Sequence, residues 1–255
     1  MNEVKAKKFL GQHFLTDETI AQRIVESLSP DTHHLIEIGP GMGVLTKYMV
    51  HNAALDLKVI EIDRESVAYL HHHYPTLQVI EGDFLRYDLE SLFPAHYAVI
   101  GNFPYNISSQ ILFRVFDQRD RIDEVVGMFQ KEVAERVAAG PGSKTYGILS
   151  VLLSAFYTIE YLFTVHEHVF NPPPKVKSAV IRLRRNDVHT LDCDEHLFVQ
   201  VVKAGFNQRR KTLRNALRQL NLSLEAVPEM FLAKRAEQLS VNEFITITKA
   251  IESCR

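Results

Sequence analysis

Short apolar runs that favour β-strands alternate with helical patterns between residues 35 and 184, and this alternation constrains the fold more than any other feature. The first five runs lie at residues 35–38, 59–62, 77–80, 97–100 and 125–129. Successive strands separated by helices pair in parallel. The alternation therefore predicts an α/β fold, with a mostly parallel sheet covered by helices on both faces.

Two more strand-like runs, at residues 157–165 and 179–183, flank three consecutive prolines, Pro172 to Pro174. Proline cannot continue a helix, so we expect an extended loop between two antiparallel strands that close the sheet. After residue 186 the apolar residues recur only at helical spacing, and a capping box at Ser240 and Glu243 predicts the start of the last helix. The sequence thus predicts an α/β domain at residues 1–186 and a small all-helical domain at residues 187–255.

The composition excludes several classes of protein. No apolar run among the 255 residues approaches the roughly 18 needed to cross a membrane, so we expect a cytoplasmic protein without membrane contact. Cys193 and Cys254 lie far apart and outside any metal-ligand spacing, and His71 to His73 would point in different directions on a helix. We predict free thiols, no bound metal and, because nothing requires an oligomer, a monomer.

A glycine-rich loop at residues 39–43 follows the first strand, where open α/β sheets bind nucleotides. Glycine lets a ligand approach the backbone, but Val44 occupies the last glycine position of the dinucleotide fingerprint, which disfavours NAD and FAD. We expect an amphipathic helix after the loop. A tight turn with a purely structural role is the alternative.

Carboxylates follow the second and third strands. Glu61 comes about twenty residues after the loop, where it can accept hydrogen bonds from both ribose hydroxyls of a nucleotide, and Asp83 can accept one from an adenine amine. Each carboxylate taken alone is also explained as a solvated strand end. Gly39, Glu61 and Asp83 nevertheless fall at the carboxyl ends of successive strands, so we expect them to converge on one crevice.

The fourth strand ends in Asn102-Phe103-Pro104-Tyr105, a motif suited to the methylation of an amine on a planar ring. Such an amine is a poor nucleophile, because its lone pair is delocalised into the ring. The Asn102 side-chain oxygen and the backbone carbonyl of Phe103 or Pro104 can accept its protons, and Tyr105 offers a face for stacking. Catalysis would depend on alignment and electrostatics rather than on a strong base. A strand-terminating turn is the structural alternative.

Phe170, beside the three prolines, is a second aromatic candidate. If its loop folds over the crevice, Phe170 and Tyr105 could hold one flipped base between them. A hydrophobic plug beneath the loop is the alternative.

Basic residues cluster in the helical tail, although the formal net charge of the chain is −2. No acidic residue interrupts the series Lys203, Arg209, Arg210, Lys211, Arg214 and Arg218. In one continuous helix, Arg210, Arg214 and Arg218 would form an i, i+4, i+8 stripe suited to phosphates. We interpret the series as an RNA-binding surface, with a solvated helix face as the alternative.

Together these segments resemble the ribosomal RNA adenine N6,N6-dimethyltransferases over nearly the whole chain, and among them the small-subunit enzymes linked to kasugamycin sensitivity. The matching segments are residues 8–15, 37–43, 59–63, 82–83, 102–108, 170–180 and 206–215. The resemblance implies a Rossmann-like class I methyltransferase sheet. It also implies that residues 1–186 bind S-adenosyl-L-methionine and catalyse the reaction, and that residues 187–255 bind RNA.

The resemblance further implies roles for individual residues. It assigns the methionine end of the cofactor to His13 and Leu15, its amino-acid portion to the loop of Gly39 and Gly41, the ribose to Glu61, the adenine amine to Asp83, and both cofactor and target to Asn102. The family more often has asparagine in place of His13 and leucine in place of Phe103.

The substrate that the resemblance implies is a pair of adjacent adenines in the 3′-terminal hairpin loop of 16S rRNA. Each would be methylated twice on N6 within an immature small subunit during ribosome biogenesis, with S-adenosylhomocysteine as the other product. The alternatives are methylation of large-subunit rRNA, as in macrolide resistance, methylation of DNA, and a non-catalytic role in ribosome assembly. Residues 206–215 favour the small subunit, Phe103 disfavours DNA, and intact Asn102, Tyr105 and Glu61 favour an active enzyme.

Overall fold

The computed structural model describes residues 4–254, and the chain forms two compact units. The first unit contains the chain up to Ala134 together with Glu160–Arg185, and the second contains Glu135–Ile159 and the chain from Asn186 onward. One division, at Arg185 and Asn186, lies next to the boundary predicted from sequence. No pattern in residues 135–159 indicated that they group with the helical tail.

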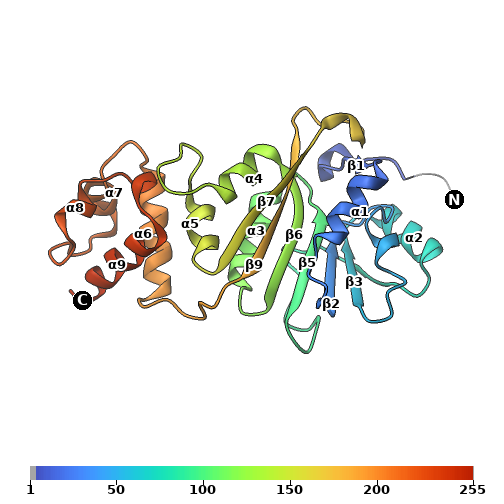
Figure 1. Ribbon diagram of the computed structural model, residues 1–255, viewed down its shortest axis with the longest axis horizontal. Helices are drawn as coiled ribbons and strands as arrows, with labels where there is room; N and C mark the ends of the chain where they lie inside the picture. Colours follow the sequence, from blue (N-terminus) through green and yellow to red (C-terminus); the bar gives the residue numbers. More distant parts are fainter. Residues whose placement is uncertain (1–3, 255) are drawn as a thin grey trace. The chain divides into compact units, whose positions relative to one another are not determined.

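The first unit is built on a sheet of seven strands in the order β4-β3-β2-β5-β6-β9-β7 (Figure 1). In chain order the strands are β2 (His34–Ile38), β3 (Asp56–Glu61), β4 (Gln78–Glu81), β5 (Tyr97–Asn102), β6 (Ile122–Gln130), β7 (Tyr157–Val165) and β9 (Ser178–Arg185). Strands β2 to β6 pair in parallel, and β9 runs antiparallel to β6. The predicted α/β fold with a mostly parallel sheet is confirmed.

Helices α1 (Glu18–Glu26) and α3 (Ser108–Asp117) lie on opposite faces of this sheet, and α2 (Arg64–His73) contacts β3 and β4 (Figure 1). Asp17 caps α1 by accepting a hydrogen bond from the backbone of Ile20 at 3.1 Å. A separate pair of short strands, β1 (Phe14–Leu15) and β8 (Phe170–Asn171), joins the start of the chain to the loop that contains the prolines. α4 (Lys131–Ala138) crosses from the first unit into the second.

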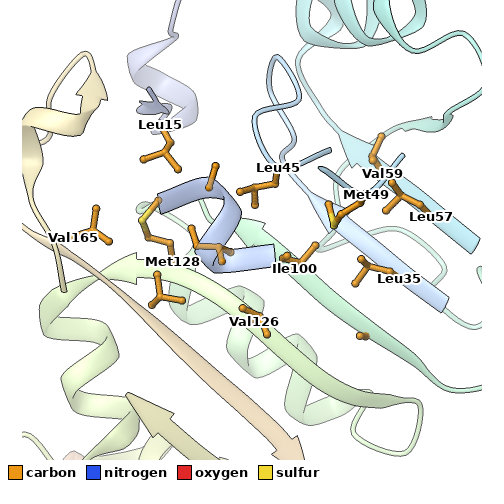
Figure 2. Packing of buried hydrophobic residues seen from close by; sticks show 14 of the residues in the cluster. Leu15, Leu35, Leu45, Met49, Leu57, Val59, Ile100, Val126, Met128 and Val165 are labelled. Carbon is orange, nitrogen blue, oxygen red and sulfur yellow. The ribbon is translucent and has the colours of Figure 1, made fainter. Parts of the chain in front are cut away.

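A core of buried apolar residues packs α1 against the strands of the sheet (Figure 2). Leu35, Val59 and Ile100 occupy β2, β3 and β5 and are buried together with Ala21 and Ile24 of α1. Alternate residues of a strand face the same side, so these apolar positions turn one face of each strand towards the helix.

The prediction of an amphipathic helix after the glycine-rich loop is wrong. The helical structure there is one 3-10 turn, Thr46–Tyr48. The backbone N–H of Gly43 donates to the carbonyl of Pro40 at 2.8 Å, and Gly43 has a φ of 82°. The turns of the loop therefore take up residues that a helix would need. Leu45 and Met49 are nevertheless buried, so the apolar pattern reports burial correctly without a helix.

The second unit is helical apart from the first residues of β7. Its helices are α5 (Ile148–Ser154), α6 (Glu195–Asn207), α7 (Leu213–Leu217), α8 (Glu229–Leu232) and α9 (Val241–Glu252), besides the end of α4. The predicted capping box is confirmed at α9. Ser240 Oγ accepts a hydrogen bond from Glu243 N at 3.2 Å, and Glu243 Oε2 accepts one from Ser240 N at 2.7 Å.

Among residues 4–254 no helix combines the length and the apolar character that crossing a membrane requires. Cys193 and Cys254 are free thiols. His71 to His73 are exposed on α2, and within the same described residues no three His, Cys, Asp or Glu side chains gather as a metal site would require.

Candidate active site

A cavity of about 510 Å³ lies in the first unit at the carboxyl ends of β2, β3 and β5. Its walls come from residues 10–14, Ile38, Gly39, Gly41, residues 60–62, 82–86 and 102–107, and Gln110. Site residues predicted from sequence that line it are His13, Gly39, Gly41, Glu61, Asp83, Asn102, Pro104 and Tyr105. The carboxyl edge of an open α/β sheet is where such folds bind their ligands.

Gly39 and Gly41 have φ angles of 65° and 56°, in the left-handed region that favours glycine. A Cβ atom on Gly41 would also lie 2.8 Å from Cε1 of Phe14, which lines the cavity as well. Position 41 therefore requires glycine for two reasons: its backbone conformation and the lack of space for a Cβ atom. The main chain of the loop forms the wall that a ligand meets.

Glu61 is almost fully buried at the end of β3, where three backbone N–H groups hold its carboxylate. Oε1 accepts from Ile62 and Asp63, both at 2.9 Å, and Oε2 accepts from Gly41 at 3.0 Å. Burial raises the pKa of the Glu61 carboxyl, and these hydrogen bonds oppose the rise. A carboxylate oxygen has two lone pairs, so Oε2 retains an acceptor position for a ligand hydroxyl.

Asp83 lies two residues after β4 and lines the cavity beside Glu61. Its Oδ1 accepts a hydrogen bond from the backbone of Leu85 at 3.0 Å, and Oδ2 lies 3.7 Å from Nε of Arg86. The carboxylate is thus oriented by the turn that follows the strand. It is partly exposed, so it can accept a hydrogen bond from a ligand amine at the rim.

Glu37 was not selected from the sequence, yet it lies directly before the glycine-rich loop and is buried. Thr46 Oγ1 donates to its Oε2 at 2.6 Å. Burial raises the pKa of the Glu37 carboxyl from 4.5 to about 8, the Thr46 hydrogen bond lowers it, and the charge of Glu61 raises it further. The available signal was a glutamate inside an otherwise apolar strand, which must be paired or neutral when buried.

Asn102 ends β5, and its side-chain amide donates to the carbonyl oxygen of His13 at 2.9 Å. The His13 ring in turn reaches another segment, since Nδ1 lies 2.8 Å from the carbonyl oxygen of Pro172. With its N–H group engaged, the Asn102 amide keeps Oδ1 as an acceptor within the cavity wall.

Phe103 is buried, and its ring packs on Phe129 with the ring centroids 4.8 Å apart. The carbonyl of Pro104, one of the two proposed acceptors for an amine, already receives hydrogen bonds from Ile107 N at 3.2 Å and Ser108 Oγ at 3.1 Å. Of the two carbonyls predicted from sequence, that of Phe103 is therefore the better placed to accept a ligand proton.

Tyr105 is held on two sides. Its hydroxyl is hydrogen-bonded to Ser178 Oγ at the start of β9, and its ring stacks on His13 with centroids 5.3 Å apart and planes 29° apart. Burial raises the pKa of the Tyr105 hydroxyl, and the Ser178 bond opposes the rise. The stacked His13 leaves the opposite face of Tyr105 for a base. Ser178 had no signal in the sequence beyond its place after the proline loop.

Phe170 and Leu15 do not line the cavity. They pair with each other across β1 and β8, and both side chains are buried in the core under α1, each only 4% exposed. The expectation that Phe170 faces Tyr105 across the crevice is therefore wrong for this structure. The strand pairing turns the Phe170 side chain inward, as the hydrophobic plug named as the alternative.

The predicted basic stripe in the second unit is interrupted. Helix α6 ends at Asn207, and the backbone N–H of Leu213, at the start of α7, donates to the carbonyl of Lys234 at 2.7 Å. The i, i+4, i+8 arrangement of Arg210, Arg214 and Arg218 is thus wrong, because Arg210 lies in the turn between two helices.

Acidic residues distant in sequence reach part of the basic series. Arg214 forms an ion pair with Glu229, and Nε of Arg209 lies 3.9 Å from Glu237. The residues of the series also differ in exposure. The exposed ones are Lys203, Arg210, Lys211 and Arg218, whereas Arg209 and Arg214 are partly buried.

Comparisons with known proteins identify the family of the chain. The family model described as ribosomal RNA adenine dimethylase matches residues 3–253. Ribosomal RNA small subunit methyltransferase A of Cytophaga hutchinsonii is 60% identical, over 98% of this chain and 99% of the relative, and that of Bacteroides fragilis is 56% identical, over 99% and 94%. The crystal structure of a dimethyladenosine transferase from Plasmodium falciparum has a TM-score of 0.74 at 26% identity, covering 92% of this chain and 96% of that one. The chain belongs to the ribosomal RNA adenine dimethylase family.

Proposed function

We propose that this protein transfers methyl groups from S-adenosyl-L-methionine to N6 of two adjacent adenines in the 3′-terminal hairpin loop of 16S rRNA. The products are N6,N6-dimethyladenines and S-adenosylhomocysteine. The protein acts as a cytoplasmic monomer on an immature small ribosomal subunit. One observation carries the proposal: a single cavity is lined by Glu61 and by the reactive segment from Asn102 to Tyr105.

The acceptor set of the cavity fits the cofactor. Glu61 Oε2 is suited to the ribose hydroxyls, Asp83 to the adenine amine, and the main chain of Gly39 and Gly41 to the amino-acid portion. His13 lines the same wall and is suited to the methionine end, whereas Leu15 does not line the cavity and its side chain is in the core. When bound, the cofactor supplies an electrophilic methyl group on a sulfonium.

Two acceptors suit the first transfer to an adenine amine. Asn102 Oδ1 and the carbonyl of Phe103 accept the two N6 protons, which turns the nitrogen lone pair out of conjugation and aligns it for attack. The new N–CH3 bond forms as the bond from carbon to sulfur breaks, and one N6 proton then leaves to water. After this step only one N–H remains, so the second transfer requires only one of the two acceptors.

Tyr105 supports the target base from its free face. His13 covers the other face, and the Ser178 hydrogen bond fixes the rotation of the ring, so the stacking surface is formed before substrate arrives. Stacking of a base on an aromatic ring contributes roughly 1–3 kcal/mol in single-strand binders. Aromatic faces also stabilise the positive charge that develops on the methylated amine.

The exposed basic residues of the second unit support binding of the rRNA. Lys203, Arg210, Lys211 and Arg218 are suited to phosphate contacts that position the RNA without reading its sequence. Arg209 and Arg214 contribute less, because Glu237 and Glu229 already offset their charges.

The experiment that tests the proposal incubates the full chain with methyl-labelled cofactor and, separately, with undermethylated small subunits, large subunits and DNA. We expect label only on the two adjacent adenines of the small-subunit RNA, with up to two methyls on each. Label confined to large subunits or to DNA would contradict the proposed small-subunit rRNA substrate. Binding to small subunits without any transfer would favour a non-catalytic assembly factor.

A further inference from the structure

One wall of the cavity is a segment that precedes the sheet, residues 7–14, which we call the N-terminal strap. Leu10 to Phe14 line the cavity. The end of the strap nearest the sheet is held by the pairing of Phe14 with Asn171, by the hydrogen bond from Asn102 to the His13 carbonyl and by the contact of the His13 ring with Pro172. The other end depends on different contacts.

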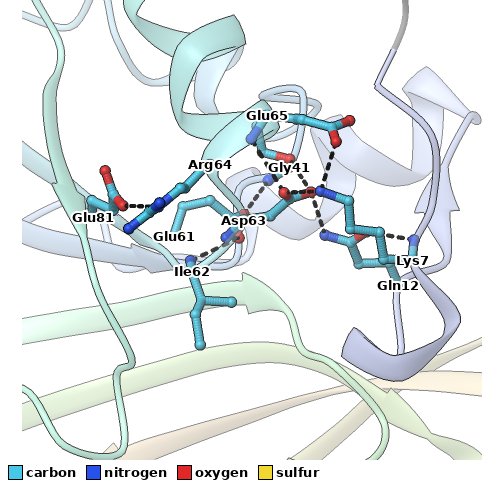
Figure 3. Close-up of polar contacts among 10 residues, drawn as sticks. Lys7, Gln12, Gly41, Glu61, Ile62, Asp63, Arg64, Glu65 and Glu81 are labelled. Atoms are coloured by element: carbon cyan, nitrogen blue, oxygen red, sulfur yellow. Dashed lines mark hydrogen bonds and ion pairs between the residues drawn. The ribbon is translucent and has the colours of Figure 1, made fainter.

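That other end is attached to the segment that follows Glu61 (Figure 3). Lys7 Nζ lies 2.5 Å from Oδ1 of Asp63 and 3.0 Å from Oε1 of Glu65. Gln12 Nε2 donates to Oδ2 of Asp63 at 3.3 Å, and Gln12 Oε1 accepts the backbone N–H of Lys7 at 2.8 Å. The side chains of Lys7 and Gln12 thus both bind the carboxylate of Asp63.

Asp63 is well suited to hold the strap, because its side chain is only 1% exposed and accepts hydrogen bonds from both Lys7 and Gln12. It also caps α2 by accepting from Glu65 N at 3.2 Å, and it accepts from Ser66 Oγ at 3.3 Å. Burial raises the pKa of the Asp63 carboxyl, but the hydrogen bonds from Lys7 and Gln12 outweigh it, and the pKa lies below its usual value. A buried carboxylate of this kind requires its cation.

The backbone of Asp63 completes the connection, because its N–H donates to Glu61 Oε1 at 2.9 Å. We propose that Lys7 and Gln12 are positioning residues for the cofactor: through Asp63 they hold the strap against the part of the wall that carries Glu61. This inference rests on the proposed function, which makes Glu61 the ribose ligand. Coupling of this kind is reciprocal, so a loose strap weakens cofactor binding and a bound cofactor restrains the strap.

The test measures binding of S-adenosylhomocysteine to the full chain by calorimetry, together with hydrogen exchange of residues 8–14 in ligand-free protein. Lys7→Ala and Gln12→Ala are compared with Lys8→Ala, which removes the same charge from an exposed position of the strap that does not line the cavity. We expect Lys7→Ala to raise the Kd roughly tenfold, as the loss of a charge-assisted hydrogen bond implies, and to speed exchange of the strap. Lys8→Ala should change neither, and Lys7→Arg should restore most of the affinity.

The double variant Lys7→Ala/Gln12→Ala should raise the Kd by less than the product of the two fold changes of the single variants, because both side chains act through Asp63. Unchanged Kd and exchange in Lys7→Ala would overturn the inference, as would an equal loss in Lys8→Ala or a lowered melting temperature with unchanged Kd. Wild-type protein that binds S-adenosylhomocysteine but labels no RNA would instead overturn the proposed function and leave the role of the strap standing.

Discussion

The ring of Phe103 lies over Gly127 of the neighbouring strand, so closely that a Cβ atom on Gly127 would be 2.0 Å from Cε2 of Phe103. Gly101, which pairs with Gly127 in the register of β5 and β6, would bring a Cβ atom to within 2.8 Å of Cε1 of the same ring. The second residue of the reactive segment is thus an aromatic ring seated on two glycines of the sheet.

Gly127→Ala should displace Phe103 and with it the carbonyl that we propose accepts an amine proton. We expect a loss of roughly 1–3 kcal/mol in the free energy of unfolding, typical of overpacking, and reduced methyl transfer. Phe103→Leu in the same background should restore part of both, since the smaller side chain removes the clash. Urea unfolding and transfer assays on the single and double variants measure this. A fully stable and active Gly127→Ala protein would show that the ring has room to move.

Asn102→Ala should remove most methyl transfer while leaving RNA binding nearly intact. The variant loses the acceptor for one N6 proton, and the loss of one such polar contact in a transition state typically lowers kcat about 100-fold or more. Single-turnover transfer and a filter-binding assay with the same RNA separate the two effects. Transfer at the wild-type rate would exclude the aligning role.

Glu61→Gln should weaken cofactor binding because three backbone N–H groups surround the carboxylate. A glutamine oxygen cannot serve all three, and its amide N–H2 must then face at least one donor. We expect the Kd for S-adenosylhomocysteine to rise roughly 10- to 100-fold. Glu81→Gln is the matched control, because Glu81 ends the adjacent strand and does not line the cavity. Equal effects of the two substitutions would contradict the prediction.

Glu37 should make stability depend on pH. Its pKa is about 8 in the folded protein and 4.5 ordinarily, so between these values the folded chain holds a proton that the unfolded chain has lost. The contribution of Glu37 to stability is therefore complete below pH 4.5 and falls as the pH rises to about 8. Relative to Glu37→Gln, the free energy of unfolding should fall by up to about 1.4 kcal/mol per pH unit in this range. Parallel pH profiles of the two proteins would refute this.

Arg210→Ala and Arg214→Ala should differ, because Arg210 is exposed and Arg214 is paired with Glu229. We expect Arg210→Ala to weaken RNA binding and to reduce the slope of log affinity against log salt by about 0.7–0.9, as for one lost phosphate contact. Arg214→Ala should have a smaller effect on the slope. Titrations at several salt concentrations measure both, and identical slopes for wild type and Arg210→Ala would remove Arg210 from the interface.

The strand pattern and the convergence of Gly39, Glu61 and Asp83 could be predicted because they depend on local chemistry. An apolar run signals a buried strand, and the carboxyl ends of parallel strands share one edge of the sheet. The prediction of a helix after the loop was wrong because apolar spacing reports burial and not the type of local structure. Burial of Leu45 and Met49 gives the same apolar spacing in a series of turns as in a helix.

Contacts between distant segments could not be predicted. The inward orientation of Phe170 depends on its pairing with Leu15, and the break in the basic stripe depends on the hydrogen bond from Leu213 to Lys234. Neither partner is marked by residue type or spacing. The same is true of Ser178 at Tyr105, which only the fold brings together.

The bond between His13 and Pro172 joins residues 159 positions apart, and it has a consequence for the order of events during synthesis. As the nascent chain leaves the ribosome, the strap has no partner strand until β8 follows it out. By then every other wall of the cavity has already been translated. An unfinished chain therefore lacks both the pairing of the strap with β8 and its hydrogen bond to Pro172, so this wall of the proposed cofactor site gains its last attachments late, when nearly all of the first unit exists.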